Sequence, residues 1–389
     1  MKYVLMVMDP EVRVNQQITL GLARGLQTEG AWHVHVQNRN VPMSHYIELI
    51  GELGPKAVVG QYIAPKVVTY LEERSIPVVS VAHKLHNLVI TAHDPQYIVN
   101  PDEIAIGTTA AEYVLSQGFE HFAYVAYNPA NPGPRMKAFA NVIRKNRMPL
   151  NSYFYQEHPT VEHITFDFAK SEDLQKWLHK LPKPSAIFTH SDKVGAHIVS
   201  TSIRTGLRVP DDIAVLGVDD DPLFCRTVMP NLASVRVPYQ RLGIEAARII
   251  LKQPSKRVVR NVPPSIVAER ASCRAPHYSD PLVDKALEYL RLHVEDGVKV
   301  SDMQKLTGLT SHQLIYRFHK ATGLTPINMI LRQRMARAKQ LLIETTEPVS
   351  AIAGRCGFNN PNRFYLSFRD FVGMSPGDYR DFFEQKVHS

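Results

Sequence analysis

Two kinds of hydrophobic periodicity divide the chain. From residue 1 to about 275, short β-branched and apolar runs alternate with stretches in which apolar residues recur every three or four positions, as at Ile18, Leu22 and Leu26. The first pattern is typical of buried strands and the second of helices with one apolar face. Strands are predicted at Tyr3–Met8, His33–Gln37, Ala57–Gly60, Pro77–Ala82, Phe122–Tyr127, Ala186–Thr189, Ile213–Val218 and Ala233–Val237. Strands and helices alternating at this spacing favour doubly wound parallel sheets, and the length favours two lobes.

The pattern changes after Ala275-Pro276, beyond which only helical periodicity is found. Helices are predicted at Ser301–Leu306, Ser311–Ala321, Pro326–Thr345, Val349–Arg355 and Pro361–Val372. We therefore expect an α/β part at residues 1–275, a linker at 276–283 and an all-α part at 284–389. Two pairs of short helices, at 301–322 and 349–372, form helix-turn-helix patterns, in which the second helix can enter a major groove of DNA.

The ends of these helices carry residues suited to their positions. A Ser or Thr followed three positions later by Gln, at Ser301 and at Thr310, is a capping-box pattern in which the hydroxyl accepts a backbone N–H. Asn360 and Ser375 each precede a Pro, a residue favoured at the first helical position. Gly308 stands where the first short helix is expected to end.

Composition indicates a globular intracellular protein. Of the 389 residues, 44% are hydrophobic and 21% charged, which is typical of globular domains, and the net charge of +8 suits an anionic partner. Cys225, Cys273 and Cys356 form no CxxC pair, so neither a disulfide framework nor a zinc site is indicated. The apolar start at residues 2–8 is too short for a secretory signal, and no apolar run is long enough to span a bilayer. We expect a cytoplasmic protein that does not bind membranes.

Positive charge gathers on the predicted C-terminal helices. Residues 311–344 contain six Lys or Arg residues against one acid, Glu344, and residues 355–369 contain three Arg residues and no acid. On helices that face DNA, such residues contact phosphates and give a salt-dependent affinity. A solvated helical face is the alternative interpretation of the same charges.

Residues 284–386 resemble the DNA-binding domain of AraC/XylR-type transcription regulators. The stretches that carry the resemblance follow one another in the family's order: Ser311-His-Gln-Leu-Ile-Tyr-Arg-Phe318, Gly323-Leu-Thr-Pro326, Val349-Ser-Ala-Ile-Ala353, Arg363-Phe-Tyr-Leu-Ser-Phe-Arg369 and Gly373-Met-Ser-Pro376. The resemblance implies a sequence-specific regulator with two helix-turn-helix units joined by one long helix. Two such units would reach successive major grooves, about 34 Å apart, on one face of a duplex.

Exposed residues near the starts of the two recognition helices are expected to contact bases. Asn and Gln can pair with adenine, and Arg can pair with guanine. The candidates are His312, Gln313, Tyr316 and Arg317 in the first unit, and Asn359, Asn362 and Arg363 in the second. Gln313 has an alternative role, because the capping box would use the same side chain. Spacing assigns apolar positions such as Leu314 and Phe368 to the core.

An acidic cluster follows the predicted strand Ile213–Val218, in the stretch Val209-Pro-Asp-Asp-Ile-Ala-Val-Leu-Gly-Val-Asp-Asp220. Open α/β sheets bind ligands at the carboxyl ends of their strands, and carboxylate oxygens accept hydrogen bonds from sugar hydroxyls. With Ala186-Ile-Phe-Thr-His-Ser-Asp192 and Pro230-Asn-Leu-Ala-Ser-Val-Arg-Val-Pro238, residues 1–272 resemble the periplasmic-binding-protein-like sensor of LacI-type regulators. The resemblance implies a ligand cleft between two lobes that are hinged by crossing strands.

The resemblance also implies a set of ligand-binding residues. Asp219 matches the family's ligand-binding Asp, Arg135 matches an Arg that holds ligand hydroxyls, and Asp192 matches an Asn or Asp that follows a strand. Three more are inferred from their position alone. The full set is Asp219, Arg135, Asp192, Asp102, Asp9 and Asn15. For each carboxylate, a helix N-cap or a solvated loop is the alternative role.

The order of the sensor and the DNA-binding part indicates the type of regulator and its expected partners. LacI-type regulators begin with a helix-turn-helix, whereas this chain begins with the sensor and ends with the AraC-type module. That order points to a regulator, expected to be an activator, controlled by a small sugar, with D-xylose or another pentose as the first candidate. We expect a homodimer on paired half-sites of double-stranded DNA, with RNA polymerase as a further partner. No cofactor, metal or catalytic residue is expected.

Two motifs suggest other functions and are discounted. Gly373-Met-Ser-Pro-Gly377 fits the nucleophile elbow of hydrolases, but Pro376 lacks the N–H that an oxyanion hole needs, and helices flank both sides. His83, His86 and His93, or the pair His33 and His35, could suggest a metal, but no third ligand has suitable spacing. A sugar-processing α/β enzyme is the alternative function, and it would need a matched acid and base that the sequence does not indicate.

Overall fold

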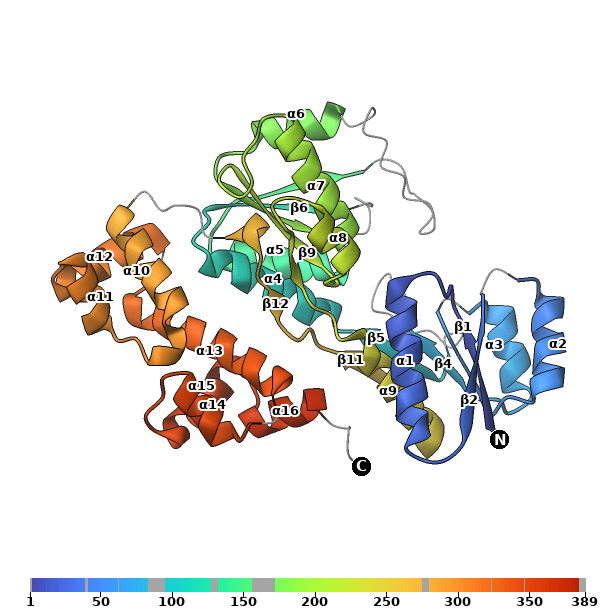
Figure 1. Ribbon diagram of the computed structural model, residues 1–389. Coiled ribbons are helices and arrows are strands. Elements are labelled where there is room, and N and C mark those ends of the chain that lie inside the picture. Colours follow the sequence, from blue (N-terminus) through green and yellow to red (C-terminus); the bar gives the residue numbers. More distant parts are fainter. Residues whose placement is uncertain are drawn as a thin grey trace.

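The computed structural model places the chain in two α/β lobes and one helical domain (Figure 1). It describes residues 2–38, 41–61, 63–82, 95–126, 132–155, 172–274, 280–322, 324–345 and 347–384. The helical domain lies against the lobe that is formed by the middle of the chain, and the lobe that contains the N-terminus lies at the opposite end of the molecule.

Lobe I is a three-layered unit built on a six-stranded parallel sheet in the order β11-β5-β4-β3-β1-β2. Its strands are β1 (Lys2–Val7), β2 (Trp32–Gln37), β3 (Ala57–Gly60), β4 (Val78–Val81), β5 (Tyr97–Pro101) and β11 (Val258–Val262). Helices α1 (Arg13–Gln27) and α9 (Tyr239–Lys252) cover one face of the sheet, while α2 (Met43–Leu53) and α3 (Pro65–Glu72) cover the other. Because both faces are covered, the central strands β3 and β4 are buried along their whole length and are almost entirely apolar.

Lobe II repeats this architecture with a sheet in the order β12-β10-β9-β8-β6-β7. Its strands are β6 (His121–Ala126), β7 (Leu150–Phe154), β8 (Ser185–Thr189), β9 (Ile213–Val218), β10 (Ala233–Val235) and β12 (Val267–Ala268), of which only β12 pairs antiparallel with its neighbour. Helices α4 (Glu103–Ser116) and α5 (Gly133–Lys145) pack on one face, and α6 (Glu172–Lys180), α7 (Asp192–Arg204) and α8 (Pro222–Thr227) lie on the other side.

The chain passes between the lobes three times. The first crossover is at Asp102, between β5 of lobe I and α4 of lobe II, and the second is at 236–238, between β10 and α9. The third, at 263–266, joins β11 of lobe I to β12 of lobe II. The second and third crossovers are hydrogen bonded to each other, since Arg236 N donates to Ile266 O at 2.8 Å and Ser265 N donates to Arg236 O at 3.0 Å.

The helical domain is two small bundles that share one long helix. Its helices are α10 (Pro281–Leu292), α11 (Val300–Thr307), α12 (Ser311–Thr322), α13 (Pro326–Glu344), α14 (Val349–Arg355), α15 (Pro361–Val372) and α16 (Pro376–Glu384). Met329 and Ile330 of α13 pack with α10, α11 and α12, whereas Met335 and Leu342 of the same helix pack with α14, α15 and α16. Each half of α13 therefore completes the core of one helix-turn-helix unit.

The structure confirms the predicted fold class and adds strands that the sequence pattern did not reveal. The missed strands are β5, β7, β11 and β12. Of these, β12 has only two residues, and β7 lies at a sheet edge and is partly exposed, so neither gives a clear apolar run. The predicted strand Ala233–Val237 ends two residues earlier, at Val235, because the chain there leaves lobe II for lobe I.

Helix-start predictions succeeded at three of four positions. The side chains of Thr310, Asn360 and Ser375 accept backbone N–H groups of the following helices, as expected. The capping box predicted at Ser301 is wrong, because α11 begins at Val300 and Asp302 accepts from the backbone N–H of Lys299 at 2.8 Å instead.

Two glycines let α1 and α9 cross with their backbones in contact. A Cβ at Gly243 would lie 2.0 Å from Ile18 O and 2.4 Å from Leu22 N, and a Cβ at Gly21 would lie 1.9 Å from Gln240 O. The obstructing atoms are backbone, so a side chain could be accepted only by moving one helix away from the other. This crossing holds α9, which follows the second crossover, on the sheet of lobe I.

The first prediction concerns this crossing. Gly243→Ala should lower the free energy of unfolding of the sensor by about 1–3 kcal/mol, the usual cost of overpacking a closely packed contact. Gly51→Ala is the matched control, because Gly51 is also helical but has no atom within 4 Å of the added Cβ. The control should be neutral or stabilising, by up to about 1 kcal/mol. Urea unfolding followed by circular dichroism measures both, and equal stability of the two variants would contradict the proposed close packing.

Candidate ligand and DNA-binding sites

The loop that follows β9 has an unusual backbone. Asp219 and Asp220 have φ angles of 110° and 57°, in the left-handed region that non-glycine residues rarely adopt. Such conformations persist only where the surroundings impose them, and they are concentrated at functional sites. The loop stands at the carboxyl end of a central strand, where open α/β sheets bind ligands.

Hydrogen bonds on both sides hold this loop in place. Asp220 accepts from Arg236 Nε at 2.7 Å and from Arg270 at 2.6 Å, while its own N–H donates to Ser234 Oγ at 3.0 Å. The N–H of Asp221 donates to Asp192 Oδ2 at 2.7 Å. With its neighbours tied in this way, the Asp219 carboxyl is presented at the end of the strand.

Asp219 and Arg135 lie in one charged cluster at this edge. Tyr239 Oη donates to Asp219 Oδ1 at 2.5 Å, and Arg135 donates to both carboxylate oxygens of Glu103, at 2.7 and 2.9 Å, and to His190 O at 2.5 Å. Burial raises the pKa of Asp219 to about 6, although the nearby Arg135 guanidinium acts in the opposite direction. The cluster can both donate hydrogen bonds to ligand hydroxyls and accept them from those hydroxyls.

Two of the cluster's members, Glu103 and Tyr239, were not among the sequence candidates. Asp102 was, but it is the N-cap of α4, with its carboxylate accepting the N–H of Ala105 at 2.9 Å. The adjacent Glu103 is the acid that reaches Arg135. An Asp directly before a helix commonly caps that helix, and this is the alternative role that the sequence already offered for the carboxylate.

Asp192 occupies a supporting position inside lobe II. Its side chain is 1% exposed and packs against Gly217, where a Cβ would lie 2.1 Å from its Oδ1 atom. Burial and the nearby Asp219 raise the pKa of Asp192 above its usual value. Its hydrogen bond to Asp221 makes Asp192 a residue that positions the acidic loop.

The lobe I candidates lie at the carboxyl end of β1 and the start of α1. Asn15 is buried and donates from its Nδ2 atom to Asp9 O at 3.0 Å, and its Oδ1 has no hydrogen-bond partner among the described residues. From the same helix start, Arg13 lies 3.8 Å from the Asp221 carboxylate of lobe II. The candidate residues of lobe I are thus on the side of that lobe that meets the Asp219 loop.

Five of the seven candidate DNA-binding residues are exposed at the surface. They lie on α12, on α15 and just before α15, and they are His312, Tyr316, Asn359, Asn362 and Arg363. No ion pair of Arg363 is found within the part of the chain that the structure describes.

Gln313 and Arg317 of the first unit are engaged within the protein. The Oε1 atom of Gln313 accepts from the backbone N–H and from the hydroxyl of Thr310, at 3.0 and 3.1 Å, which is its alternative capping role. Arg317 donates to Asp280, the residue that caps α10, at 3.0 Å. Each of these side chains is therefore oriented by a protein partner.

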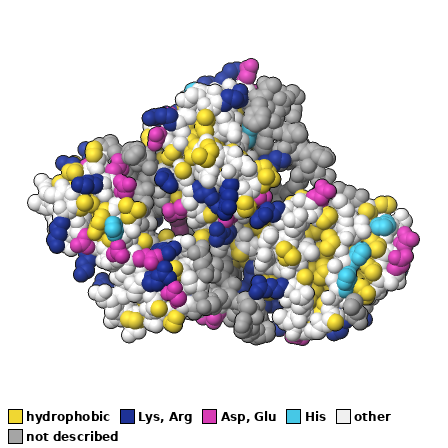
Figure 2. Space-filling view, in the orientation of Figure 1, with side chains coloured by type: hydrophobic (Ala, Val, Ile, Leu, Met, Phe, Trp, Pro, Cys, Tyr) yellow, Lys and Arg dark blue, Asp and Glu magenta, His cyan; other side chains and the backbone are white. Residues whose placement is uncertain are grey.

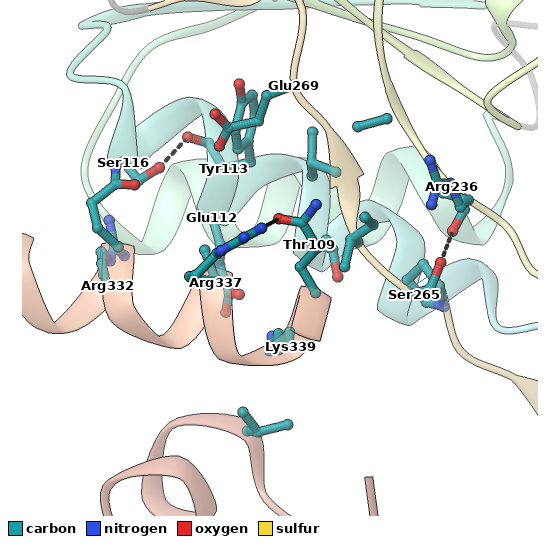
Figure 3. A pocket seen from close by; sticks show the side chains of 18 of the residues that line it. Thr109, Glu112, Tyr113, Ser116, Arg236, Ser265, Glu269, Arg332, Arg337 and Lys339 are labelled. Atoms are coloured by element: carbon teal, nitrogen blue, oxygen red, sulfur yellow. Dashed lines mark hydrogen bonds between the residues drawn. The ribbon is translucent and has the colours of Figure 1, made fainter. Parts of the chain in front are cut away.

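The expectation that the basic residues of α13 and α14 face DNA is wrong for several of them. Arg337 and Arg355 both bind Glu295, which lowers the pKa of that carboxyl, and Arg334 donates to Val298 O at 2.8 Å. Arg332 and Lys339 line a cavity of about 1060 Å³ between α13 and lobe II. Figure 3 shows Arg332 on the side of α13 that faces α4, with Lys339 further along the same helix, and Figure 2 shows Lys and Arg side chains where lobe II meets the helical domain.

Metal and membrane sites are not indicated by the described residues. Within the described ranges, no three His, Cys, Asp or Glu side chains are grouped so as to hold a metal ion, and no helix is long and apolar enough to cross a membrane. His83, His86 and His93 lie outside those ranges. Ser375, part of the discounted nucleophile-elbow pattern, caps α16.

Comparison with known proteins matches both parts of the chain. Residues 111–273 match the model of a periplasmic binding protein-like domain, and residues 303–381 match that of a helix-turn-helix domain. The chain is 24% identical over 379 residues to the xylose operon regulatory protein of Escherichia coli (strain K12), with 94% of each chain covered. It is 24% identical over 375 residues to the protein of that name from Haemophilus influenzae, with 94% of this chain and 95% of the relative covered.

Solved structures give the same fold. The structure of the xylose-binding transcription activator XylR superposes with a TM-score of 0.59 at 22% identity and covers 97% of both chains. A cellobiose complex of the regulator CelR superposes with a TM-score of 0.53 at 20% identity over 69% of this chain and 84% of that one.

Fold, domain matches and full-length relatives together define a DNA-binding transcription regulator with a ligand sensor at its N-terminal end. In its order of parts, a periplasmic binding protein-like sensor followed by a helix-turn-helix domain, the chain is similar to AraC/XylR-type regulators.

The second prediction uses the raised pKa of Asp219. The folded chain holds this proton up to a pH of about 6, whereas the unfolded carboxyl loses it near 3.8. The folded state therefore binds the proton more tightly, and its stability should fall as pH rises between these values. Asp219→Asn should flatten this fall, as measured by urea unfolding from pH 4 to 7. Asp211→Asn, which removes an exposed carboxyl of the same lobe, should retain the slope of the unaltered chain.

Proposed function

We propose that this protein is a sugar-controlled transcription activator in which a small sugar, D-xylose or another pentose, binds between the two lobes. The observation that carries the proposal is the charged cluster at the carboxyl end of β9, where the charges of Asp219 and Arg135 interact on the side of lobe II that faces lobe I. A polyhydroxylated ligand suits a site that offers carboxylate acceptors beside a guanidinium donor. The full-length relative from Escherichia coli is a xylose operon regulatory protein, and the similar XylR structure is that of a xylose-binding transcription activator.

Asp219 and Arg135 are proposed to contact the sugar from lobe II, and Asp9 and Asn15 from lobe I. The Oδ1 atom of the buried Asn15, which has no hydrogen-bond partner among the residues that the structure describes, supports its inclusion. Asp192 and Asp102 are given positioning roles, the first by holding the acidic loop and the second by capping the helix that carries Glu103. Binding to both lobes would favour a closed arrangement to the extent that the sugar has higher affinity for that state.

DNA contacts are assigned to α12 and α15. His312, Tyr316, Asn359, Asn362 and Arg363 are proposed to face the bases of two successive major grooves. Gln313 and Arg317, which are oriented by Thr310 and Asp280, are kept as further candidates for DNA contacts. A cytoplasmic homodimer on paired half-sites, with RNA polymerase as a further partner, completes the proposal. A sugar-processing enzyme is the alternative.

The third prediction tests the sugar and DNA functions together. Duplexes that bind the full-length chain are selected in vitro from a random library, and their affinity is measured by gel shift in a salt series with D-xylose, L-arabinose, D-ribose and D-glucose. The logarithm of the binding constant should fall linearly with the logarithm of salt concentration, and D-xylose or another pentose should change the affinity. Asp219→Ala should abolish sugar binding in calorimetry and leave the sugar-free DNA affinity unchanged.

Asp211→Ala is the control for this experiment, because Asp211 is an exposed acid of the same lobe. It should keep the sugar response. Normal sugar binding by Asp219→Ala would refute the assigned pocket. Turnover of a sugar in the absence of any salt-sensitive DNA binding would favour the enzyme.

A further inference from the structure

The two recognition helices share one pattern of exposure. We number the positions of each helix from its first residue, which is Ser311 in α12 and Pro361 in α15. In both helices, positions four and eight are buried and position seven is half-buried. The other seven of the first ten positions are exposed. At 100° per residue, positions two, six and nine lie together on the side opposite the buried positions. These are the positions that a helix seated in a major groove would turn towards the bases.

Large apolar side chains occupy equivalent positions in both helices. Position six, on this face, is Tyr316 in α12 and Leu366 in α15, with 61% and 51% of their surface exposed. Position five, 100° from position six and so at the edge of this face, is Ile315 and Tyr365, with 47% and 42% exposed. Of the seven exposed large hydrophobic residues found in the described part of the helical domain, these are four. Isolated exposed apolar residues are common, but a pair repeated at equivalent positions indicates a surface that makes contacts.

The chemistry of the major groove supplies a partner for such a surface. Thymine is the base that presents an apolar group there, its 5-methyl group. Exposed cations lie near the apolar residues: Arg363 and Arg369 on α15, and Lys320 on α12. These cations suit the two helices to approach DNA phosphates. A phosphate-lined groove with methyl groups on its floor fits both kinds of residue.

We propose that Tyr316 and Leu366, flanked by Ile315 and Tyr365, recognise the 5-methyl groups of thymines in each half-site. The proposal rests on the proposed DNA-binding function and specifies the chemistry that it reads. Because Gln313 and Arg317 are held by Thr310 and Asp280, apolar readout accounts for a larger share of the specificity of α12 than of α15, whose Arg363 is exposed.

The fourth prediction replaces thymine with deoxyuridine, which differs only in lacking the methyl group. In the best duplex selected with the full-length chain, each thymine is replaced in turn. One or more replacements should weaken binding roughly three- to tenfold, the effect of losing a buried methyl contact. Leu366→Ala should lose most of this preference at one of those thymines, whereas its affinity for the uracil duplex should change little.

Ile327→Ala is the matched control, because Ile327 is an apolar residue of the same domain, 62% exposed, at the start of α13 rather than on a recognition helix. It should retain the full preference for thymine. Indifference to every uracil substitution would overturn the proposal, as would an unchanged preference in both Leu366→Ala and Tyr316→Ala. If the variants lose transcription with RNA polymerase but keep normal DNA binding, the face binds a protein instead. Failure to select any duplex would count against the proposed function itself.

A second and independent observation concerns the way in which the helical domain is attached to the sensor. Tyr379 of α16 donates its hydroxyl to Ser265 O at 2.9 Å, and the residue is 5% exposed. Ser265 belongs to the third crossover between the lobes. The DNA-binding domain is therefore hydrogen bonded directly to a segment about which the lobes must rotate when they close.

A continuous set of contacts runs from this bond to the proposed sugar site. The Oγ and N atoms of Ser265 both donate to Arg236 O, on the second crossover, and Figure 3 shows the Oγ bond. The side chain of Arg236 binds Asp220, next to Asp219 in the acidic loop. In the other direction, the Tyr379 ring packs against Phe368 of α15, with 5.4 Å between ring centroids. Phe368 is in the core beneath the second recognition helix.

The surroundings of the bond leave room for relative movement. The cavity of about 1060 Å³ separates α4 from α13, and Glu112 lines it from the sensor side opposite Arg332 and Lys339. Burial lowers the pKa of both cations, and the charge of Glu112 opposes that effect. A packed interface without this space would resist rotation of one domain against the other.

We infer that the Tyr379–Ser265 hydrogen bond couples closure of the two lobes to the orientation of α15. This inference also rests on the proposed function. Sugar binding would shift the crossovers, and the crossovers would carry Tyr379 and the attached recognition helix. Coupling of this kind is reciprocal, so DNA must alter sugar affinity by the same factor by which sugar alters DNA affinity.

The fifth prediction removes one hydroxyl. Tyr379→Phe keeps the ring against Phe368 and loses the hydrogen bond to Ser265. The variant should reduce the sugar-induced change in DNA affinity at least threefold. If the sugar changes the affinity of the unaltered chain by less than threefold, the variant should show no sugar-induced change. The sugar's affinity in the presence of DNA should change by the same factor. Fluorescence anisotropy with the selected duplex, with and without D-xylose, measures the first quantity, and calorimetry measures the second.

Tyr97→Phe is the matched control. Tyr97 is also 5% exposed and donates to a backbone carbonyl, that of Pro254 at 2.6 Å, but both residues lie in or beside lobe I, away from the crossovers. The control should retain full coupling. Full coupling in Tyr379→Phe, or an equal loss in Tyr97→Phe, would overturn the inference. Absence of any sugar effect in the unaltered chain would instead refute the proposed sugar response.

Discussion

Lobe I cannot complete its core without residues from far along the chain. Its sheet begins with β1 to β5, but one of the two helices on one face, α9, and the strand that closes one edge, β11, come after most of lobe II. Leu242, Ala246 and Ile250 of α9 are buried against that sheet. The chain must therefore cross between the lobes three times. These crossovers, two of which are hydrogen bonded to each other, join the lobes side by side and leave rotation about them as the available motion.

The acidic loop after β9 depends on that arrangement. Its left-handed residues are held from below by Ser234, and from the side by Arg236 and Arg270, which belong to segments that leave lobe II and return to it. A strained loop of this kind can keep a carboxyl presented at the end of a strand without relaxing into a helix cap. The same Arg236 belongs to the crossover that contacts Ser265, so the ligand side of the loop and the attachment of the helical domain share one residue.

The helical domain uses much of its positive charge for internal contacts. Arg337 and Arg355 share Glu295, a residue before α11, and so tie the two helix-turn-helix units to one another. Arg317 is paired with Asp280, the residue that caps α10. A basic sequence segment is thus a poor guide to which cations meet DNA, since partly buried Arg side chains stabilise a fold when an acid or a carbonyl is within reach.

The sequence by itself determined the class of each part. Alternating apolar runs predicted the two parallel-sheet lobes, and cap residues such as Thr310 and Asn360 predicted helix starts that the structure confirms. Both signals are local, because hydrophobic periodicity and capping depend on residues a few positions apart. The same reasoning failed for β11 and β12, which are strands only because distant segments pair with them.

Only the tertiary structure decided which side chains contact one another at the ligand site and between the domains. Glu103 rather than Asp102 meets Arg135, and Tyr239, 20 residues beyond Asp219 in the chain, supplies that carboxyl's hydrogen bond. Tyr379 and Ser265 are separated by 114 positions, yet they join the sensor to the DNA-binding domain. The direction of a side chain follows from the packing of whole elements, and that packing is a long-range property that no local pattern in the sequence encodes.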